Sequence, residues 1–200
     1  TNNYISLSGE YVNSWINISA NVYSNWFRNK IEGMWSNDQT ELHYVNIGKS
    51  RLAGVETMCK IQINRHINVH GAYNYLYTSK DADGVRLSSS SPHSGNIRAE
   101  YNTRIPRYAT VVNLSGNIMG KKKFDVLDEQ EIDGKKVEAY YQAKVNPYCL
   151  WDLTVSQYIM QNLRITAGIT NLFDYTSDRV TFNTSTSPGR NYFIACNYTL

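Results

Sequence analysis

Hydrophobic and polar residues alternate along most of this chain with a period of two. From Val55 to Ile63, the odd positions are apolar or Thr, whereas the even positions are Glu, Met, Lys and Gln. A period of two places successive side chains on opposite faces of a β-strand, whereas an amphipathic helix needs a period of 3.6. The pattern therefore predicts strands with one apolar face and one amide-rich face. Helical periodicity is almost absent.

The same two-faced pattern recurs from end to end and predicts nine strands. We expect these at 4–12, 15–28, 42–63, 67–77, 94–103, 108–119, 148–159, 163–172 and 191–200. Each is long enough for the ~9 to 11 residues with which a tilted strand crosses a membrane. No apolar run approaches the ~18 to 20 residues of a membrane-spanning helix, so a helical membrane protein is excluded.

The connections between these strands alternate in length. Short turns are expected near 13–14, 64–66, 104–106 and 161–162, and long polar loops at 29–41, 79–93, 120–146 and 174–190. Outer-membrane barrels combine short periplasmic turns with long extracellular loops and carry aromatic girdles near both ends of their strands. Tyr73, Tyr75 and Tyr77 form such a group just before the loop at Ser79. The pattern favours a membrane β-barrel, and a soluble β-sandwich or jelly roll is the alternative.

Composition changes this picture little. The 200 residues suit one domain, and charged residues make up 18% with a net charge of +3, below the usual quarter for soluble domains. That balance gives no indication of a nucleic-acid partner. The three cysteines are scattered without C-x-x-C spacing, so they form neither a disulfide framework nor a zinc site. The chain begins Thr1-Asn2-Asn3 without Met or a signal peptide, and we expect it to be a fragment of a longer protein.

Candidate chemistry is sparse. The four histidines have no ligand spacing, and the acidic run from Asp125 to Glu138 lacks the residue order of a calcium loop. The run Lys121-Lys122-Lys123 lies at a strand-to-loop junction, where a plain solvated turn is favoured over contact with anionic lipopolysaccharide. No nucleophile–base pair, phosphate-binding loop or pair of carboxylates emerges. We therefore expect no enzyme activity, no metal site and no cofactor.

Three segments resemble TonB-dependent outer-membrane receptors. The first is the Y-V-N-I-G-K-S-R-L-A-G-V-E run of residues 44–56, and the second is Leu150-Trp151-Asp152-Leu153 at a strand start. The third is N-L-F-D at 171–174, followed by P-G-R at 188–190 and a final strand. In order and spacing, the chain resembles the last part of the family's barrel, most closely that of cobalamin transporters. One departure is the terminal Leu200, because family members usually end in Phe.

The resemblance implies an all-β, antiparallel up-and-down meander, the C-terminal portion of a transmembrane barrel with about nine of its 22 strands. Residues 1–200 would then be the C-terminal segment of the barrel, with the plug domain and coupling segment missing upstream. The implied function is energy-coupled uptake of a scarce nutrient complex, of the ferric siderophore, haem or cobalamin class, across the outer membrane of a Gram-negative bacterium. The implied partners are that substrate, outer-membrane lipid and the TonB complex. The alternative is a soluble β-sandwich adhesion or carbohydrate-binding module.

Any substrate contact within this chain is expected from the long loops or the lumen just below them. The candidates are polar or aromatic residues near loop bases: Trp35, His43, Tyr44, Arg86, His93, Tyr140, Tyr141 and Tyr175. The residues expected to face lipid share one phase: Val55, Thr57, Ile61, Val69, Tyr73, Trp151, Leu153, Ile165 and Ile194.

The family motif residues are expected to be structural. They are Gly54, Val55, Glu56, Asn171, Leu172, Phe173, Asp174, Pro188, Gly189, Arg190 and Leu200. Asn171 and Asp174 suit hydrogen bonds to backbone groups where a strand leaves the sheet, and Phe173 suits an apolar anchor there. Pro188-Gly189 is turn chemistry that restarts the last strand. Arg190 is expected to pair with a carboxylate such as Asp174.

Overall fold

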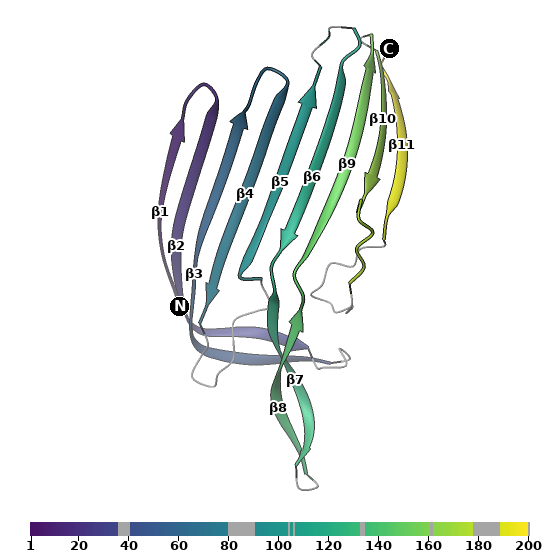
Figure 1. Cartoon of the computed structure of the whole chain (residues 1–200). Coiled ribbons are helices and arrows are strands. Elements are labelled where there is room, and N and C mark those ends of the chain that lie inside the picture. The colour runs from purple at the N-terminus through teal and green to yellow at the C-terminus, as the bar shows by residue number, and fades with distance from the viewer. Residues whose placement is uncertain are drawn as a thin grey trace.

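The fold is a single curved antiparallel sheet (Figure 1). The computed structural model describes residues 1–35, 41–79, 91–103, 105, 107–132, 135–160, 162–177 and 189–199. Their strands are β1 (Asn2–Val12), β2 (Ile16–Trp35), β3 (Leu42–Gln62), β4 (Ile67–Thr78), β5 (His93–Asn102), β6 (Thr110–Met119), β7 (Lys122–Ile132), β8 (Lys135–Val145), β9 (Tyr148–Ile159), β10 (Leu163–Thr170) and β11 (Asn191–Tyr198). Nine of them form the sheet, in the order β1-β2-β3-β4-β5-β6-β9-β10-β11. The predicted nine-stranded meander is confirmed.

Two of the predicted loops contain regular structure instead. The expected loop at 120–146 holds β7 and β8, which pair only with each other and project away from the sheet as a separate hairpin (Figure 1). The expected loop at 29–41 is entered by β2, which continues to Trp35 opposite Leu42. A period-two signal is present in β8, which the sequence-based prediction missed: Val137, Ala139, Ala143 and Val145 alternate there with Lys136, Glu138, Gln142 and Lys144.

The short turns are built with one repeated device. The Asn13 side-chain oxygen Oδ1 accepts hydrogen bonds from the backbone N–H groups of Trp15 and Ile16, at 2.9 and 3.0 Å. Asn64 Oδ1 does the same for His66 and Ile67, at 2.8 and 3.0 Å. This is the Asx-turn chemistry that favours Asn at chain reversals. The short turns lie together at one end of the sheet, the upper end in Figure 1, and the long connections leave from the other.

The register separates the residues of the sheet into two chemically distinct faces. Leu7, Val22, Val55 and Tyr75 are successive cross-strand partners, so they lie on one face. Continuing the pairing across the sheet puts all nine residues that we expect to face lipid on that side, which we call the apolar face. The opposite, polar face carries Glu10, Glu56, Lys60, His70, Arg98, Glu100, Asp152 and Arg164.

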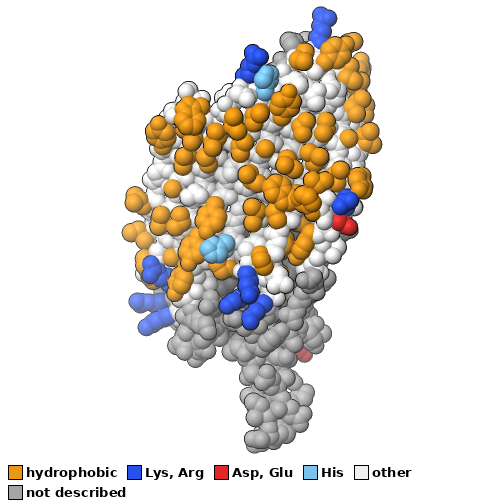
Figure 2. All heavy atoms as spheres, in the orientation of Figure 1, with side chains coloured by type: hydrophobic (Ala, Val, Ile, Leu, Met, Phe, Trp, Pro, Cys, Tyr) orange, Lys and Arg blue, Asp and Glu red, His pale blue; other side chains and the backbone are white. Residues whose placement is uncertain are grey.

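Hydrophobic side chains of the apolar face are uncovered. Leu7 is 79% exposed and Ile194 is 78% exposed, and among the described residues Val145 is the only hydrophobic side chain that is fully buried. Figure 2 shows hydrophobic side chains spread over this face, with charged side chains toward its margins. Burial of apolar surface is the main driving force for folding, so this face requires an apolar environment outside the chain.

Glycines lie beneath aromatic rings at two crowded points of the sheet. A Cβ added at Gly54 would lie 2.6 Å from the Tyr23 ring and 2.7 Å from the backbone oxygen of Tyr75. A Cβ added at Gly116 would lie 2.8 Å from the Trp151 ring. Because glycine has no Cβ, the neighbouring ring can pack directly against the backbone at these positions. The same packing occurs in other sheets where an aromatic residue covers a cross-strand glycine.

Candidate functional site

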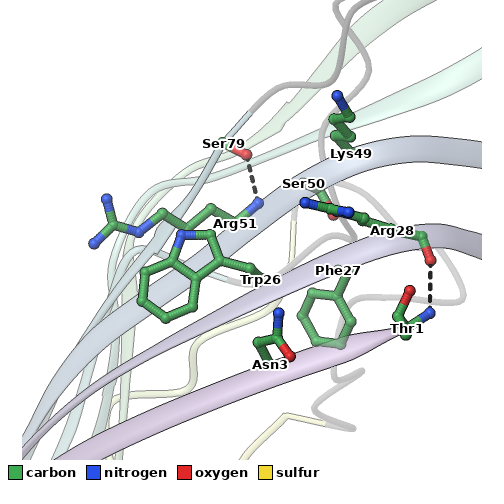
Figure 3. A pocket seen from close by; sticks show the side chains of 9 residues that line it. All are labelled: Thr1, Asn3, Trp26, Phe27, Arg28, Lys49, Ser50, Arg51 and Ser79. Carbon is green, nitrogen blue, oxygen red and sulfur yellow. Dashed lines mark hydrogen bonds between the residues drawn. The ribbon is translucent and has the colours of Figure 1, made fainter.

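The polar face carries a network of charged and amide side chains. Arg98 Nη2 lies 3.3 Å from Glu100 Oε2 and donates a 2.9 Å hydrogen bond to Asn113 Oδ1. The Asn21 amide donates to Glu56 Oε2 at 3.4 Å. Away from the loop end, where Arg28, Lys49 and Arg51 (Figure 3) lie on the apolar face, the charged side chains of these strands avoid that face. An ion without a polar partner is costly in an apolar environment. The polar face therefore suits contact with water or with another polar surface.

Three buried polar atoms of the described residues have no hydrogen-bond partner. They are Asn25 Oδ1, Ser50 Oγ and Asn74 Oδ1, and the register places all three residues on the polar face. Buried polar atoms are nearly always satisfied in folded proteins, by protein groups or by ordered water. Their clustering on this face indicates that water or another polar surface completes it.

An aromatic pair marks the loop end of the polar face. The Tyr148 and Tyr175 rings stack almost in parallel, with centroids 5.0 Å apart and planes 9° apart. Tyr148 opens β9 opposite Met119, and Tyr175 comes from the segment that follows β10. The pair offers a planar aromatic surface with two hydroxyl groups. At the base of the nearby β7–β8 hairpin, partial burial lowers the pKa of Lys122.

The corner after β10 holds Tyr175 in position. Asn171 is 4% exposed; its side chain donates to the Tyr175 carbonyl at 2.7 Å and accepts from the Tyr175 N–H at 2.8 Å. The Asn171 N–H donates to Asp152 Oδ1 at 2.9 Å. Asn171 and Asp174 take left-handed backbone angles, with φ of 51° and 57°. Asn and Asp tolerate this conformation better than other non-glycine residues.

Two details of this corner differ from the sequence-based expectation. Arg190 meets Asp174 through its backbone N–H, which donates to Asp174 Oδ1 at 2.7 Å. The Arg190 side chain instead contacts Tyr192, and that hydrogen bond is the main cause that raises the pKa of Arg190. Phe173 is 68% exposed, so its ring does not anchor the corner by burial within this chain. The anchor is the buried amide of Asn171.

Four of the eight predicted contact residues have described side chains. Tyr175 stacks on Tyr148 as above. His43 and Tyr44 lie on β3 opposite the end of β2; Tyr44 is 74% exposed, and His43 Nε2 lies 3.3 Å from Glu41 Oε2. His93 lies on the apolar face, where its Nδ1 is 2.7 Å from the Tyr73 hydroxyl. No hydrogen bond or ring contact joins any two of these four described side chains.

The side chains of the remaining predicted residues are not described by the structure. Trp35, Tyr140 and Tyr141 lie on β2 and β8, with only their backbone described. Arg86, Pro188 and Leu200 lie outside the described residues. Sequence reasoning missed Tyr148. The available signal was an aromatic residue in the polar phase of its strand, directly after Pro147.

Neither a metal centre nor a spanning helix is found in the part of the chain that the structure describes. No three His, Cys, Asp or Glu side chains there are arranged to hold a metal ion. No helix formed by these residues has the length and hydrophobicity to cross a membrane.

Comparison with known proteins identifies the family. The family model described as "TonB dependent receptor-like, beta-barrel" matches residues 1–172. The chain belongs to the TonB-dependent receptor family. This receptor chain shares its all-β antiparallel meander with the barrels of solved TonB-dependent receptors.

Three solved receptors illustrate the similarity. A mutant of the ferric enterobactin receptor from Pseudomonas aeruginosa is 18% identical, with a TM-score of 0.68, and the match covers 98% of this chain and 31% of that one. The siderophore receptor PirA from Acinetobacter baumannii is 16% identical, with a TM-score of 0.71 and coverage of 98% and 31%. The ferripyoverdine receptor of the Pseudomonas aeruginosa outer membrane is 19% identical, with a TM-score of 0.69 and coverage of 98% and 26%. The present receptor chain spans less than a third of each.

Proposed function

We propose that this chain is the C-terminal segment of an outer-membrane receptor that imports a scarce nutrient complex into a Gram-negative bacterium. The class of substrate is a ferric siderophore, a haem or a cobalamin, and the similarity to solved siderophore receptors supports the first of these. Energy would come from the TonB complex through a part of the protein upstream of this segment. Outer-membrane lipid would surround the apolar face.

The observation that carries this proposal is the uncovered apolar face of a sheet whose opposite face is polar. A transmembrane barrel needs an outward apolar band between two aromatic girdles and, in channels, a polar interior. On the apolar face, Trp26, Tyr75 and Tyr77 lie toward the loop end, and Tyr11 and Tyr101 lie toward the turn end. This arrangement fits a barrel wall one sheet thick, with the apolar face toward lipid and the polar face toward a water-filled interior.

The alternative, a soluble β-sandwich module, has less support. A sandwich packs two sheets face to face, with apolar residues of both inner faces in a core about 10 Å thick. The described strands form one nine-stranded sheet and a separate hairpin. A solubility test separates the two classes: the full-length protein should sediment with outer membranes and require detergent for extraction. Recovery in the aqueous fraction would support the soluble module.

Uptake itself is testable in cells. Deletion of the full-length gene should abolish growth on the receptor's nutrient when that nutrient is limiting, and loss of TonB should have the same effect. A panel of iron chelates, haem and cobalamin would identify the substrate class. Growth of the deletion strain on every compound at the wild-type rate would contradict the proposal.

Substrate contact within this segment is proposed at the loop end of the polar face. The Tyr148–Tyr175 stack supports this, because aromatic rings supply large, rigid contact surfaces in binding sites. Alanine at seven of the predicted contact residues, leaving out His93 because it lies on the apolar face, should lower uptake, and adding Tyr148→Ala should lower it further. A matched control is the double variant Tyr11→Ala with Tyr101→Ala, because both residues lie on the apolar face, at the turn end of the sheet. Unchanged uptake at normal surface abundance would place the binding site in the remainder of the receptor.

A further inference from the structure

The Tyr148–Tyr175 stack closes a circuit of contacts that begins and ends on β9. Asp152, on the polar face of β9, accepts a hydrogen bond from the Asn171 N–H through its Oδ1, at 2.9 Å. The Asn171 side chain binds the backbone of Tyr175, and the Tyr175 ring returns to β9 by stacking on Tyr148. In Figure 1, β9 begins and β10 ends at the loop end of the sheet. The segment that follows β10 is therefore tied back to β9 at two points.

Asn171 is the buried link of this circuit. Its side-chain amide has a donor and an acceptor on separate atoms, and both bind Tyr175. Nδ2 donates to the Tyr175 carbonyl at 2.7 Å, and Oδ1 accepts from the Tyr175 N–H at 2.8 Å. Asn171 is shielded from water, which strengthens its hydrogen bonds,. Because both backbone groups of one residue are bound, the clamp fixes where Tyr175 lies and how its side chain leaves the chain.

The Tyr175 ring is held from its other side by Tyr148. The two ring centroids are 5.0 Å apart, and both residues are half-buried, so part of the stack remains open to solvent. Tyr148 is fixed in turn by β9, where it pairs with Met119 of β6. An aromatic side chain that is already ordered loses little freedom when a ligand binds, and this pre-organisation increases affinity. The open part of the stack is thus prepared for contact.

We propose that Asn171 is a positioning residue for substrate binding: its clamp on Tyr175 holds the tyrosine stack in the geometry that contacts the substrate, and so increases affinity. This role rests on the proposed function, which puts substrate contact at the stack. Asn171 acts through the backbone of Tyr175 and does not itself touch the substrate. The sequence predicts a structural role for Asn171 at the corner, and the clamp adds a role in binding.

The variant Asn171→Gly separates the clamp from the shape of the corner. The φ of Asn171 is 51°, a conformation that glycine adopts without strain. Glycine therefore keeps the path of the backbone while removing both hydrogen bonds to Tyr175. Hydrogen exchange of the Tyr175 amide in the full-length receptor checks that the clamp is released. Exchange should become faster in the variant, because this N–H loses its acceptor.

The test measures equilibrium binding to the full-length receptor purified in detergent. The probes are radiolabelled ferric enterobactin, ferripyoverdine, haem and cyanocobalamin, and the probe that the wild-type receptor binds most tightly is then used for every variant. Asn171→Gly should raise the Kd about two- to tenfold, the range expected for one aromatic contact. The maximal uptake rate per surface receptor should stay at the wild-type value. A merely structural role would instead lower the amount of receptor and leave the Kd unchanged.

A double-mutant cycle with Tyr175→Ala shows whether Asn171 acts through Tyr175. Tyr175→Ala alone should raise the Kd at least as much as Asn171→Gly alone. In the double variant, Asn171→Gly should raise the Kd no further, because the residue that Asn171 positions has lost its ring. Such non-additivity is expected of residues that act as one unit. The full additional loss in the double variant would overturn the positioning role.

A matched control is Asn64→Gly, at the turn end of the sheet. Asn64 Oδ1 also accepts two backbone hydrogen bonds, from His66 and Ile67, but this turn lies at the opposite end of the sheet from the stack. The control should keep the wild-type Kd even where fewer receptors reach the surface. A wild-type Kd in Asn171→Gly as well would overturn the positioning role and leave only a structural one.

Two further results separate the possible failures. If Asn171→Gly does not assemble, Asp152→Ala serves, because it releases the Asn171 N–H from β9. It should raise the Kd by at least about twofold, the lower end of the same range, and a wild-type Kd there would overturn the positioning role. An unchanged Kd in Tyr175→Ala, in a receptor that still imports its substrate, would overturn this role alone. A wild-type receptor that binds none of the probes would overturn the proposed function, and this role with it.

Discussion

Substituting Val55 by Arg tests the assignment of the apolar face most directly. Val55 lies on β3 between Val22 and Tyr75, its partners on β2 and β4. A strand residue advances about 3.4 Å along its strand, or roughly 2.6 Å along the membrane normal at a tilt of about 40°. From Arg51 to Ile61 the strand therefore descends about 26 Å, close to the ~25 Å height of the apolar band. Val55 then lies about 10 Å below Arg51, near the middle of the membrane.

The depth of each position sets the magnitude of the expected effect. Arg on the lipid-facing side costs about 2 to 4 kcal/mol at the midplane and about 0 to 1 kcal/mol near the interfaces. Val55→Arg should therefore lower the free energy of unfolding by about 2 to 4 kcal/mol. Ile61→Arg should cost about 0 to 1 kcal/mol, because β3 ends one residue later, at Gln62. Met58→Arg lies about 8 Å below Val55 and still within the apolar band, but on the polar face, and should cost under about 1 kcal/mol.

The measurement is a urea titration of the full-length receptor refolded into phospholipid vesicles, followed by tryptophan fluorescence. The linear dependence of unfolding free energy on denaturant gives each difference. Equal costs at Val55 and Met58 would refute the two-faced assignment. A cost at Ile61 equal to that at Val55 would refute the assignment of depth while leaving the faces intact.

Two further predictions concern local packing and the corner after β10. Gly54→Ala should destabilise the receptor by about 1 to 3 kcal/mol, because the added methyl group overlaps the Tyr23 ring,. The control Gly9→Ala has open space at its Cβ position and should change stability by less than about 0.5 kcal/mol. Equal effects of the two substitutions in the same titration would contradict the packing argument. Asn171→Ala should cost about 2 to 4 kcal/mol, because it removes two hydrogen bonds to Tyr175 and puts Ala at a positive φ,. Surface abundance measured beside unfolding free energy checks this second prediction, which fails if both stay at wild-type values.

The strands of the sheet could be predicted because each lies between two different environments. Residues such as Val55 and Glu56 alternate in polarity, and this alternation is visible in the sequence. The β7–β8 hairpin was missed because the acidic run from Asp125 to Glu138 is typical of a solvated loop, although β8 alternates in polarity from Lys136 to Val145. The extension of β2 to Trp35 lies within the expected loop at 29–41 and was missed with it.

The rim of the candidate site could be predicted only in part. The bonds of Asn171 to backbone groups follow from residue chemistry, because Asn suits both turns and left-handed backbone angles. The Tyr148–Tyr175 stack joins residues 27 positions apart, and no local pattern fixes that contact. The position of His93 on the apolar face depends on the register with Tyr75 across β4 and β5, which the loop before it does not determine.

The uncovered apolar face also affects how freely this sequence can diverge. A close-packed core resists changes of shape because neighbouring side chains must interlock, and added or removed methylene groups are felt there. In the proposed membrane location, a side chain such as Leu7 or Ile194 would instead meet fluid lipid that rearranges around it, so Val, Ile, Leu and Ala would be nearly interchangeable there. Selection would then act mainly on positions that determine register and chain reversal, such as Asn13, Asn64 and Gly54. Receptors of this kind can therefore keep one fold while most of their outward-facing residues drift.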